Sequence, residues 1–84
     1  MLTTFTLWKR NKMKTVKYKG QSFQVPEWAK FIAADACGAI YAYRTIPDKS
    51  FNKKQWVTTY ISWYAYVGEL GENRDKAYKL KEIK

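Results

Sequence analysis

Cationic side chains are interleaved with aromatic ones in the first quarter of the chain, and this pattern carries the clearest chemistry in the sequence. The candidate contact residues are Trp8, Lys9, Arg10, Lys12, Lys14, Lys17, Tyr18 and Lys19. Lysine and arginine neutralise phosphates, and aromatic faces stack on exposed bases. The pattern therefore predicts binding to nucleic acid or a nucleoprotein, by phosphate neutralisation with added stacking and without strong sequence readout.

The charge is unevenly distributed. The chain carries a net charge of +9, and residues 1–26 contain six of its cations and no acidic residue. Such a field favours a polyanion, an acidic protein or an anionic membrane surface. A purely structural explanation also fits, because lysines along an edge strand keep it soluble and block pairing with other chains. Charge is necessary for nucleic-acid binding but does not establish it.

The residues for common catalytic and metal sites are missing from the sequence. It has no histidine and one cysteine, Cys37, so the usual imidazole base, His/Cys zinc sites and nucleophilic triads cannot form. The seven carboxylates show no recognisable catalytic arrangement. Cys37 lies in a predicted turn beside Asp35, whose charge would disfavour a thiolate. We expect a protein that is not an enzyme and that has no cofactor or metal.

Cysteine usage and hydropathy bear on location. A single cysteine excludes an intramolecular disulfide, and no run resembles a secretory signal, so a cytoplasmic protein is expected. The apolar runs fall far below the roughly 20 residues that cross a bilayer, so no membrane insertion is expected.

The elements that must position these residues form one domain over residues 1–84 in our prediction, with an α+β fold. It consists of a small antiparallel sheet of hairpins with a helix over residues 72–84 packed on it. Strands are predicted at 2–8, 13–19, 22–25, 31–34, 39–44 and 55–67.

The first predicted hairpin joins 13–19 to 22–25 through Gly20, which can take a positive φ. Alternation places Lys14, Val16 and Tyr18 on one face and a basic set, Thr15, Lys17 and Lys19, on the other. Pro26 should end the strand, with a short helical turn over 27–30.

The second predicted hairpin turns at residues 35–38, where Asp35 and Gly38 occupy the positions that favour chain reversal. On its return strand, Ile40, Ala42 and Arg44 face one way, and Tyr41 and Tyr43 face the other.

Residues 55–67 have the strongest β composition but exceed the usual strand length, which predicts a bend near Ile61 and Ser62. The aliphatic parity is the expected core face. Tyr60, Tyr64 and Tyr66 on the other parity would either form an exposed contact platform or shield the sheet beneath the helix, and we prefer the second interpretation. The tryptophans Trp28, Trp56 and Trp63 are expected to anchor the core or its rim.

The C-terminal segment predicts a helix. Asn73 can cap it, and Ala77, Leu80 and Ile83 recur at three-residue spacing as a narrow apolar stripe. Lysines near its end would suit the negative end of the helix dipole.

One block resembles small bacteriophage proteins of uncharacterised role over residues 13–70. The residues that carry the resemblance are Val25, Pro26, Trp28, Ala29, Ile32, Ala33, Asp35, Gly38, Tyr41, Ala42, Tyr43 and Pro47, followed by Tyr66, Val67 and Gly68. The chain departs from the family at Cys37, where a small polar or acidic residue is common, and in residues 1–12, which form an N-terminal extension. The resemblance implies a phage origin, hence the bacterial host cytoplasm, and no catalytic residue.

Three functions remain open at this stage. The first is a phage accessory protein that binds nucleic acid or a nucleoprotein through the basic hairpin. The second is an inhibitor or modulator of a host protein, in host takeover or anti-defence, that docks to an acidic surface with tyrosine and arginine hot spots. The third is a minor structural protein.

Overall fold

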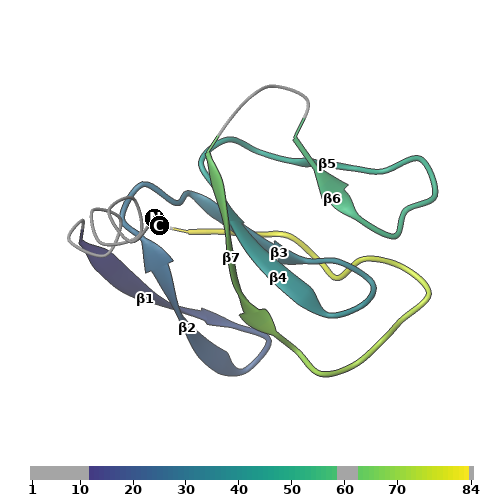
Figure 1. The fold of residues 1–84 in the computed structure, drawn as a ribbon, viewed down its shortest axis with the longest axis horizontal. Coiled ribbons are helices and arrows are strands. Elements are labelled where there is room, and N and C mark those ends of the chain that lie inside the picture. The colour runs from purple at the N-terminus through teal and green to yellow at the C-terminus, as the bar shows by residue number, and fades with distance from the viewer. Residues whose placement is uncertain (1–11, 59–62, 84) are drawn as a thin grey trace, which may run out of the picture.

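Antiparallel β-strands make up the regular structure of this chain in a computed structural model, which describes residues 12–58 and 63–83 (Figure 1). The strands are β1 Met13–Tyr18, β2 Gln21–Pro26, β3 Phe31–Ala34, β4 Ala39–Tyr43, β5 Asp48–Lys49, β6 Trp56–Val57, β7 Tyr64–Glu69 and β8 Lys81–Glu82. The predicted α+β class is wrong for this part of the chain, since none of the described residues is helical. The predicted strand at 2–8 lies outside the described residues.

The β1–β2 hairpin is confirmed. Its turn residues Lys19 and Gly20 have φ values of 52° and 81°, the two consecutive positive φ angles that a tight two-residue hairpin turn requires. Val16 and Tyr18 are buried and Lys17 is exposed, as the alternation predicts. β2 ends at Pro26. In place of the predicted helical turn over 27–30, a single hydrogen-bonded turn is closed by the Ala29 N–H, which donates to the Pro26 carbonyl at 3.0 Å, and the Lys30 N–H donates instead to the Tyr43 carbonyl at 2.8 Å.

The central sheet has four strands in the order β7-β4-β3-β8. Its β3–β4 hairpin is confirmed, and the Gly38 N–H donates to the Asp35 carbonyl at 2.8 Å to close the turn. One face of the sheet packs against the β1–β2 hairpin, and β2 also contacts β7. The buried residues of this main core are Val16, Tyr18, Val25, Ala29, Ile32, Ala34, Ile40, Ala42 and Tyr78.

The predicted C-terminal helix over 72–84 is wrong for the residues that the structure describes. Residues 72–83 are not helical: they bend at residues 75–76 and end in β8, which pairs antiparallel with β3. The Tyr78 N–H donates to the Ala34 carbonyl at 2.9 Å, and the Ile83 N–H to the Lys30 carbonyl at 2.8 Å. The non-helical conformation is favoured over a helix because it supplies hydrogen-bond partners to the backbone groups at the edge of β3. A helix would leave those groups without partners from this segment.

The predicted strand over 55–67 is divided between two sheets. β6 pairs with β5 in a separate two-stranded sheet, whereas β7 pairs with β4, with an irregularity in register between Ile40 and Tyr41. The bend predicted at Ile61 and Ser62 lies outside the described residues. Among the residues that are described, no helix is long and apolar enough to span a bilayer.

Candidate nucleic-acid interface

Cationic side chains from two distant parts of the sequence meet beside the core residue Tyr78. We call Lys17, Lys19, Arg74, Lys79 and Lys81 the basic surface. The Lys81 Nζ donates a 2.6 Å hydrogen bond to the Lys17 carbonyl. Around the Tyr78 ring, the Lys19 Nζ lies 5.9 Å and the Arg74 guanidinium 4.4 Å from the centroid. The end of β1 and the C-terminal segment therefore form one surface.

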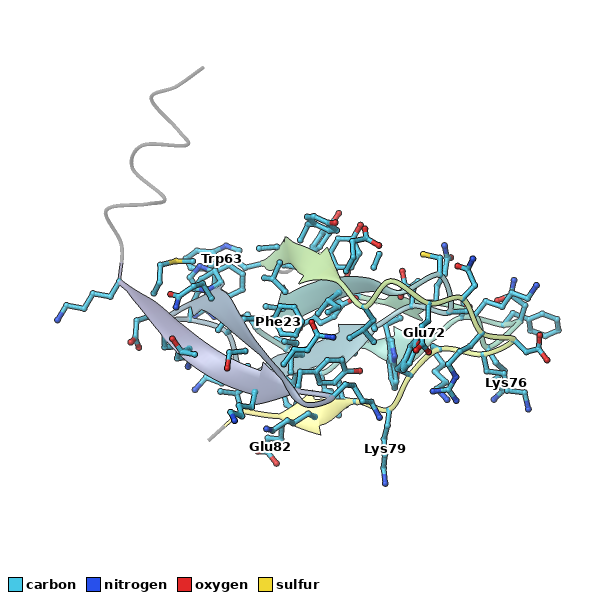
Figure 2. The ribbon with its side chains drawn as sticks, turned by 90° about the horizontal axis from the view of Figure 1, so that it is seen from below. Phe23, Trp63, Glu72, Lys76, Lys79 and Glu82 are labelled. Atoms are coloured by element: carbon cyan, nitrogen blue, oxygen red, sulfur yellow. The ribbon has the colours of Figure 1, made fainter. Side chains whose placement is uncertain are left out.

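The surface is shallow and exposed. Lys79 extends from the C-terminal segment away from the sheet (Figure 2). Tyr18, Lys19, Lys79, Leu80 and Lys81 line a hollow of about 160 Å³. Residues 74–82 contribute four cations and two acids, Asp75 and Glu82, so the C-terminal contribution is only partly offset.

Tyr18 belongs to the core, contrary to its predicted role as a stacking residue. Its side chain is 2% exposed. The hydroxyl donates to the Lys79 carbonyl at 2.6 Å and accepts from the Ala34 N–H at 3.1 Å. Burial raises the pKa of this hydroxyl. The ring is not available to a base, and Tyr18 serves instead to hold the C-terminal segment against β1.

The remaining predicted contact residues that the structure describes lie at the two ends of β1. Lys17 and Lys19 lie on the basic surface. Lys12 and Lys14 lie at the other end of β1, Lys12 exposed and Lys14 half-buried. Trp8, Lys9 and Arg10 fall outside the described residues.

Sequence reasoning missed Arg74, Lys79 and Lys81 because it assigned them to a helix. A signal was present, since Lys79, Leu80 and Lys81 alternate as they would along a strand. The three-residue spacing of Ala77, Leu80 and Ile83 was the more obvious pattern. It indicated the periodicity of a helix in place of the two-residue periodicity of a strand.

A second feature lies on the opposite face of the central sheet. We call Tyr41 and Tyr43 of β4 with Tyr64 and Tyr66 of β7 the tyrosine face. The Tyr41 ring centroid lies 5.9 Å from that of Tyr64 and 5.6 Å from that of Tyr66. Tyr43 and Tyr64 stack at 6.3 Å with 20° between their planes.

The tyrosine face is open to solvent at two of its rings. Tyr64 is 59% exposed and Tyr66 53% exposed. Our preferred prediction that these rings are shielded beneath a helix is therefore wrong, and the exposed platform is what the structure shows. Tyr60 lies outside the described residues. Among the tryptophans, Trp28 and Trp56 are half-buried, whereas Trp63 is 55% exposed.

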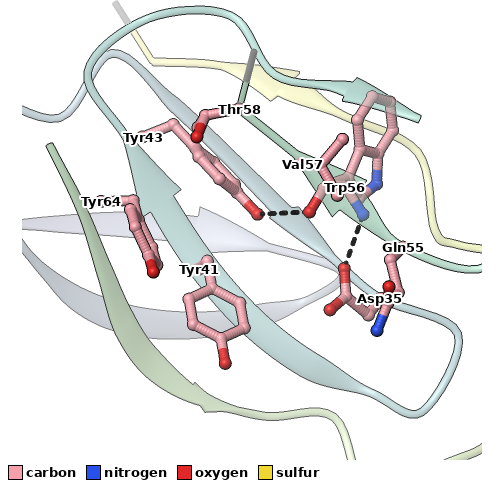
Figure 3. Close-up of a pocket in the computed structure, with 8 residues that line it drawn as sticks. All are labelled: Asp35, Tyr41, Tyr43, Gln55, Trp56, Val57, Thr58 and Tyr64. Carbon is pink, nitrogen blue, oxygen red and sulfur yellow. Dashed lines mark hydrogen bonds between the residues drawn. The ribbon is translucent and has the colours of Figure 1, made fainter. Parts of the chain in front are cut away.

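A pocket of about 330 Å³ adjoins the tyrosine face, between the sheet and β6 (Figure 3). Its lining residues are Asp35, Tyr41, Tyr43, Gln55, Trp56, Val57, Thr58 and Tyr64. The Asp35 carboxylate accepts from the Trp56 N–H at 2.8 Å. Burial raises the pKa of the Asp35 carboxyl, and this hydrogen bond partly opposes the shift.

Chemistry elsewhere is sparse. Cys37 is exposed, as its turn position predicts. Within residues 12–58 and 63–83, no three histidine, cysteine, aspartate or glutamate side chains are grouped to hold a metal ion.

The chain was compared with protein-family models, with curated proteins and with solved structures, and none of these matches it. Its function must therefore be argued from the two surfaces themselves.

Proposed function

We propose that this protein binds nucleic acid through the basic surface and does no catalysis there. The observation that carries the proposal is the hydrogen bond from the Lys81 Nζ to the Lys17 backbone carbonyl, which places the C-terminal segment beside the end of β1 that carries Lys17 and Lys19. Several cations on one continuous surface can contact several phosphates at once, whereas the same cations spread over the molecule could not.

The binding mode follows from the side chains present. Lysine ammonium groups contact phosphates as point charges, and they carry no base-specific geometry. Because Tyr18 is buried, the hairpin adds no described aromatic ring to this surface. We therefore expect affinity that depends strongly on salt and little on sequence at the basic surface.

Two charge-matched variants test the proposal. The first is the triple variant Lys19→Gln, Lys79→Gln and Lys81→Gln, on the basic surface. The second is Lys12→Gln, Lys14→Gln and Lys30→Gln, which removes the same charge elsewhere. Binding of a 20-nucleotide duplex and of its single strand is measured by fluorescence anisotropy at several salt concentrations.

The basic-surface variant should bind both forms more weakly, and its plot of log K against log salt should be flatter by roughly 2 to 3, since each lost duplex phosphate contact removes about 0.9 from the slope. The control variant should retain most of the wild-type slope. Equal losses in the two variants would show that only net charge matters. Absence of binding by the wild type at low salt would refute the proposal.

A different surface supports the alternative of contact with a host protein. The Arg44 guanidinium lies 4.6 Å from the centroid of the exposed Trp63 ring, and Trp28 meets that ring edge-on at 5.5 Å. Tryptophan and arginine dominate binding hot spots. If this alternative holds, one partner recovered from nuclease-treated host lysate should be lost on Trp63→Ala and retained by the Lys19, Lys79 and Lys81 variant. The phage origin implied by the resemblance stays a prediction.

A further inference from the structure

We propose that the tyrosine face and its pocket hold unpaired bases of a single-stranded nucleic acid whose backbone extends to the basic surface. This inference rests on the proposed function and adds the ligand class, which is a single strand. The tyrosine rings are exposed, the pocket beside them carries hydrogen-bonding groups, lysines lie between the pocket and the basic surface, and the chain has a net charge of +9.

The rings of Tyr64 and Tyr66 are exposed and contact neighbouring tyrosine rings. Tyr64 and Tyr66 are two residues apart on one strand, so both point from the same face of the sheet, roughly 7 Å apart along β7. Tyr41 contacts both rings from the neighbouring strand. Exposed aromatic rings held on a sheet provide a stacking platform for successive bases, and stacking tolerates any sequence because every base has a π-face.

The pocket adds hydrogen-bonding groups beside the platform. Gln55 supplies an amide and Thr58 a hydroxyl, each both donor and acceptor, and the Asp35 carboxylate supplies acceptors. A volume of about 330 Å³ falls within the range of small-molecule sites. A base that is splayed out of a single strand can present its Watson–Crick edge to such groups, whereas a paired base cannot.

A hydrogen bond and two cation–ring contacts connect the pocket to the basic surface through Trp56. Trp56 lines the pocket, and its indole N–H donates to the Tyr78 carbonyl at 2.9 Å. The Lys49 Nζ lies 5.5 Å from the Trp56 ring centroid, and the Lys19 Nζ lies 5.9 Å from that of Tyr78. Lys49 therefore lies at the pocket end of this connection and Lys19 at the end next to the basic surface. Both could contact phosphates of a single nucleic-acid strand that runs between the two sites.

The loop between β5 and β6 adds two more cations near the pocket. The Lys54 carbonyl accepts from the Ala36 N–H at 2.8 Å, which places this loop beside the turn that carries Asp35. Lys53 and Lys54 are exposed there. A cationic ligand would also suit tyrosine rings and a carboxylate, but the chain's charge of +9 repels it and attracts a polyanion.

The test uses the full chain with a 12-nucleotide single strand and the corresponding duplex. The variants are Tyr64→Ala, Tyr66→Ala and the double variant, with Phe51→Ala as a control for loss of an exposed ring and Tyr64→Phe with Tyr66→Phe as ring-retaining controls. Because all of these side chains are exposed, the variants should fold, which thermal unfolding checks.

We expect each alanine variant to weaken single-strand binding by about fivefold to 150-fold, the usual loss for one stacked base. Duplex binding and the salt slope should stay as in the wild type, and all phenylalanine controls and Phe51→Ala should bind normally. Ring-proton resonances of Tyr64 and Tyr66 should shift upfield when the single strand is added.

The outcomes separate this inference from the function on which it rests. If the lysine variant loses binding and the tyrosine variants do not, nucleic-acid binding stands and the base-stacking site is refuted. Equal losses for duplex and single strand in the tyrosine variants would also overturn it, because paired bases cannot reach the rings. If the wild type binds neither probe at low salt, both proposals fail.

Discussion

The hydroxyl of Tyr18 donates a 2.6 Å hydrogen bond to the carbonyl oxygen of Lys79, a residue 61 positions away in the sequence. The same hydroxyl accepts from the Ala34 N–H at 3.1 Å. One buried oxygen therefore joins the β1–β2 hairpin, the central sheet and the C-terminal segment. This contact positions both halves of the basic surface.

Replacing Tyr18 with phenylalanine should destabilise the fold without removing any surface contact. The change leaves the Ala34 N–H and the Lys79 carbonyl unpaired, which costs about 1 to 3 kcal/mol in unfolding free energy. Urea denaturation measures the loss, with Tyr64→Phe on the exposed face as a control expected within about 0.5 kcal/mol of the wild type. Similar stabilities for the two variants would contradict the role assigned to Tyr18.

Gly38 should tolerate alanine less well than Gly71 does. Both glycines have positive φ, 95° and 81°, so alanine at either position is strained. A Cβ at Gly38 would also lie 2.7 Å from the Glu72 carbonyl oxygen, whereas one at Gly71 meets nothing within 4 Å. We expect Gly38→Ala to cost about 1 to 3 kcal/mol more than Gly71→Ala, the usual cost of overpacking. Equal midpoints of thermal unfolding for Gly38→Ala and Gly71→Ala would contradict this prediction, because they would show that the backbone at Glu72 moves away from the new Cβ at no cost.

Asp35 should make stability depend on pH. Because burial raises the pKa of this carboxyl in the folded state, the folded protein holds the proton more tightly than the unfolded chain does. The stability that this protonation contributes is present below the ordinary aspartate pKa and is lost as pH rises through the folded value. The wild type should therefore lose stability relative to Asp35→Asn as pH rises through that window, measured by denaturation from pH 3 to pH 7.

Asp35→Ala separates the charge from the hydrogen bond. It removes the acceptor of the Trp56 N–H, so it should be less stable than Asp35→Asn at every pH, by about 1 to 3 kcal/mol. A pH-independent difference between the wild type and Asp35→Asn would argue against a raised pKa.

Trp56→Phe should loosen the attachment of the β5–β6 hairpin. The indole N–H donates to the Tyr78 carbonyl at 2.9 Å, and phenylalanine keeps the ring but not this donor. We expect a loss of about 1 to 2 kcal/mol in unfolding free energy. Trp63→Phe, at an exposed ring, is the matched control and should change stability less. The reverse order would contradict the anchoring role of Trp56.

The sequence predicted elements whose geometry is decided locally. Gly20 permits a tight turn because it takes a positive φ without steric cost, and the alternation of Val16 and Tyr18 fixes which side of β1 is buried. The turn from Asp35 to Gly38 is local in the same sense. Pro26 ends β2 for a covalent reason, its missing N–H.

Errors arose where distant residues decide the outcome. The spacing of Ala77, Leu80 and Ile83 fits a helix, but hydrogen bonds to Ala34 and Lys30, more than 40 residues away, hold the segment in a non-helical conformation. Helix propensity is a weak preference that such tertiary contacts override. The wrong prediction that Tyr64 and Tyr66 are shielded has the same cause. The helix that was expected to cover them does not form in the described residues, so both rings are exposed.

The amino-acid sequence by itself determined the charge, the absence of histidine and the two hairpins, since composition and local turn chemistry depend on no distant partner. Only the tertiary structure decided which cations share a surface and which aromatic rings face water. The physical reason is that a strand has two faces and a sheet has two edges, and their burial depends on which remote segment pairs with them. Lys17 and Lys81 became neighbours, and Tyr18 became core, through that pairing.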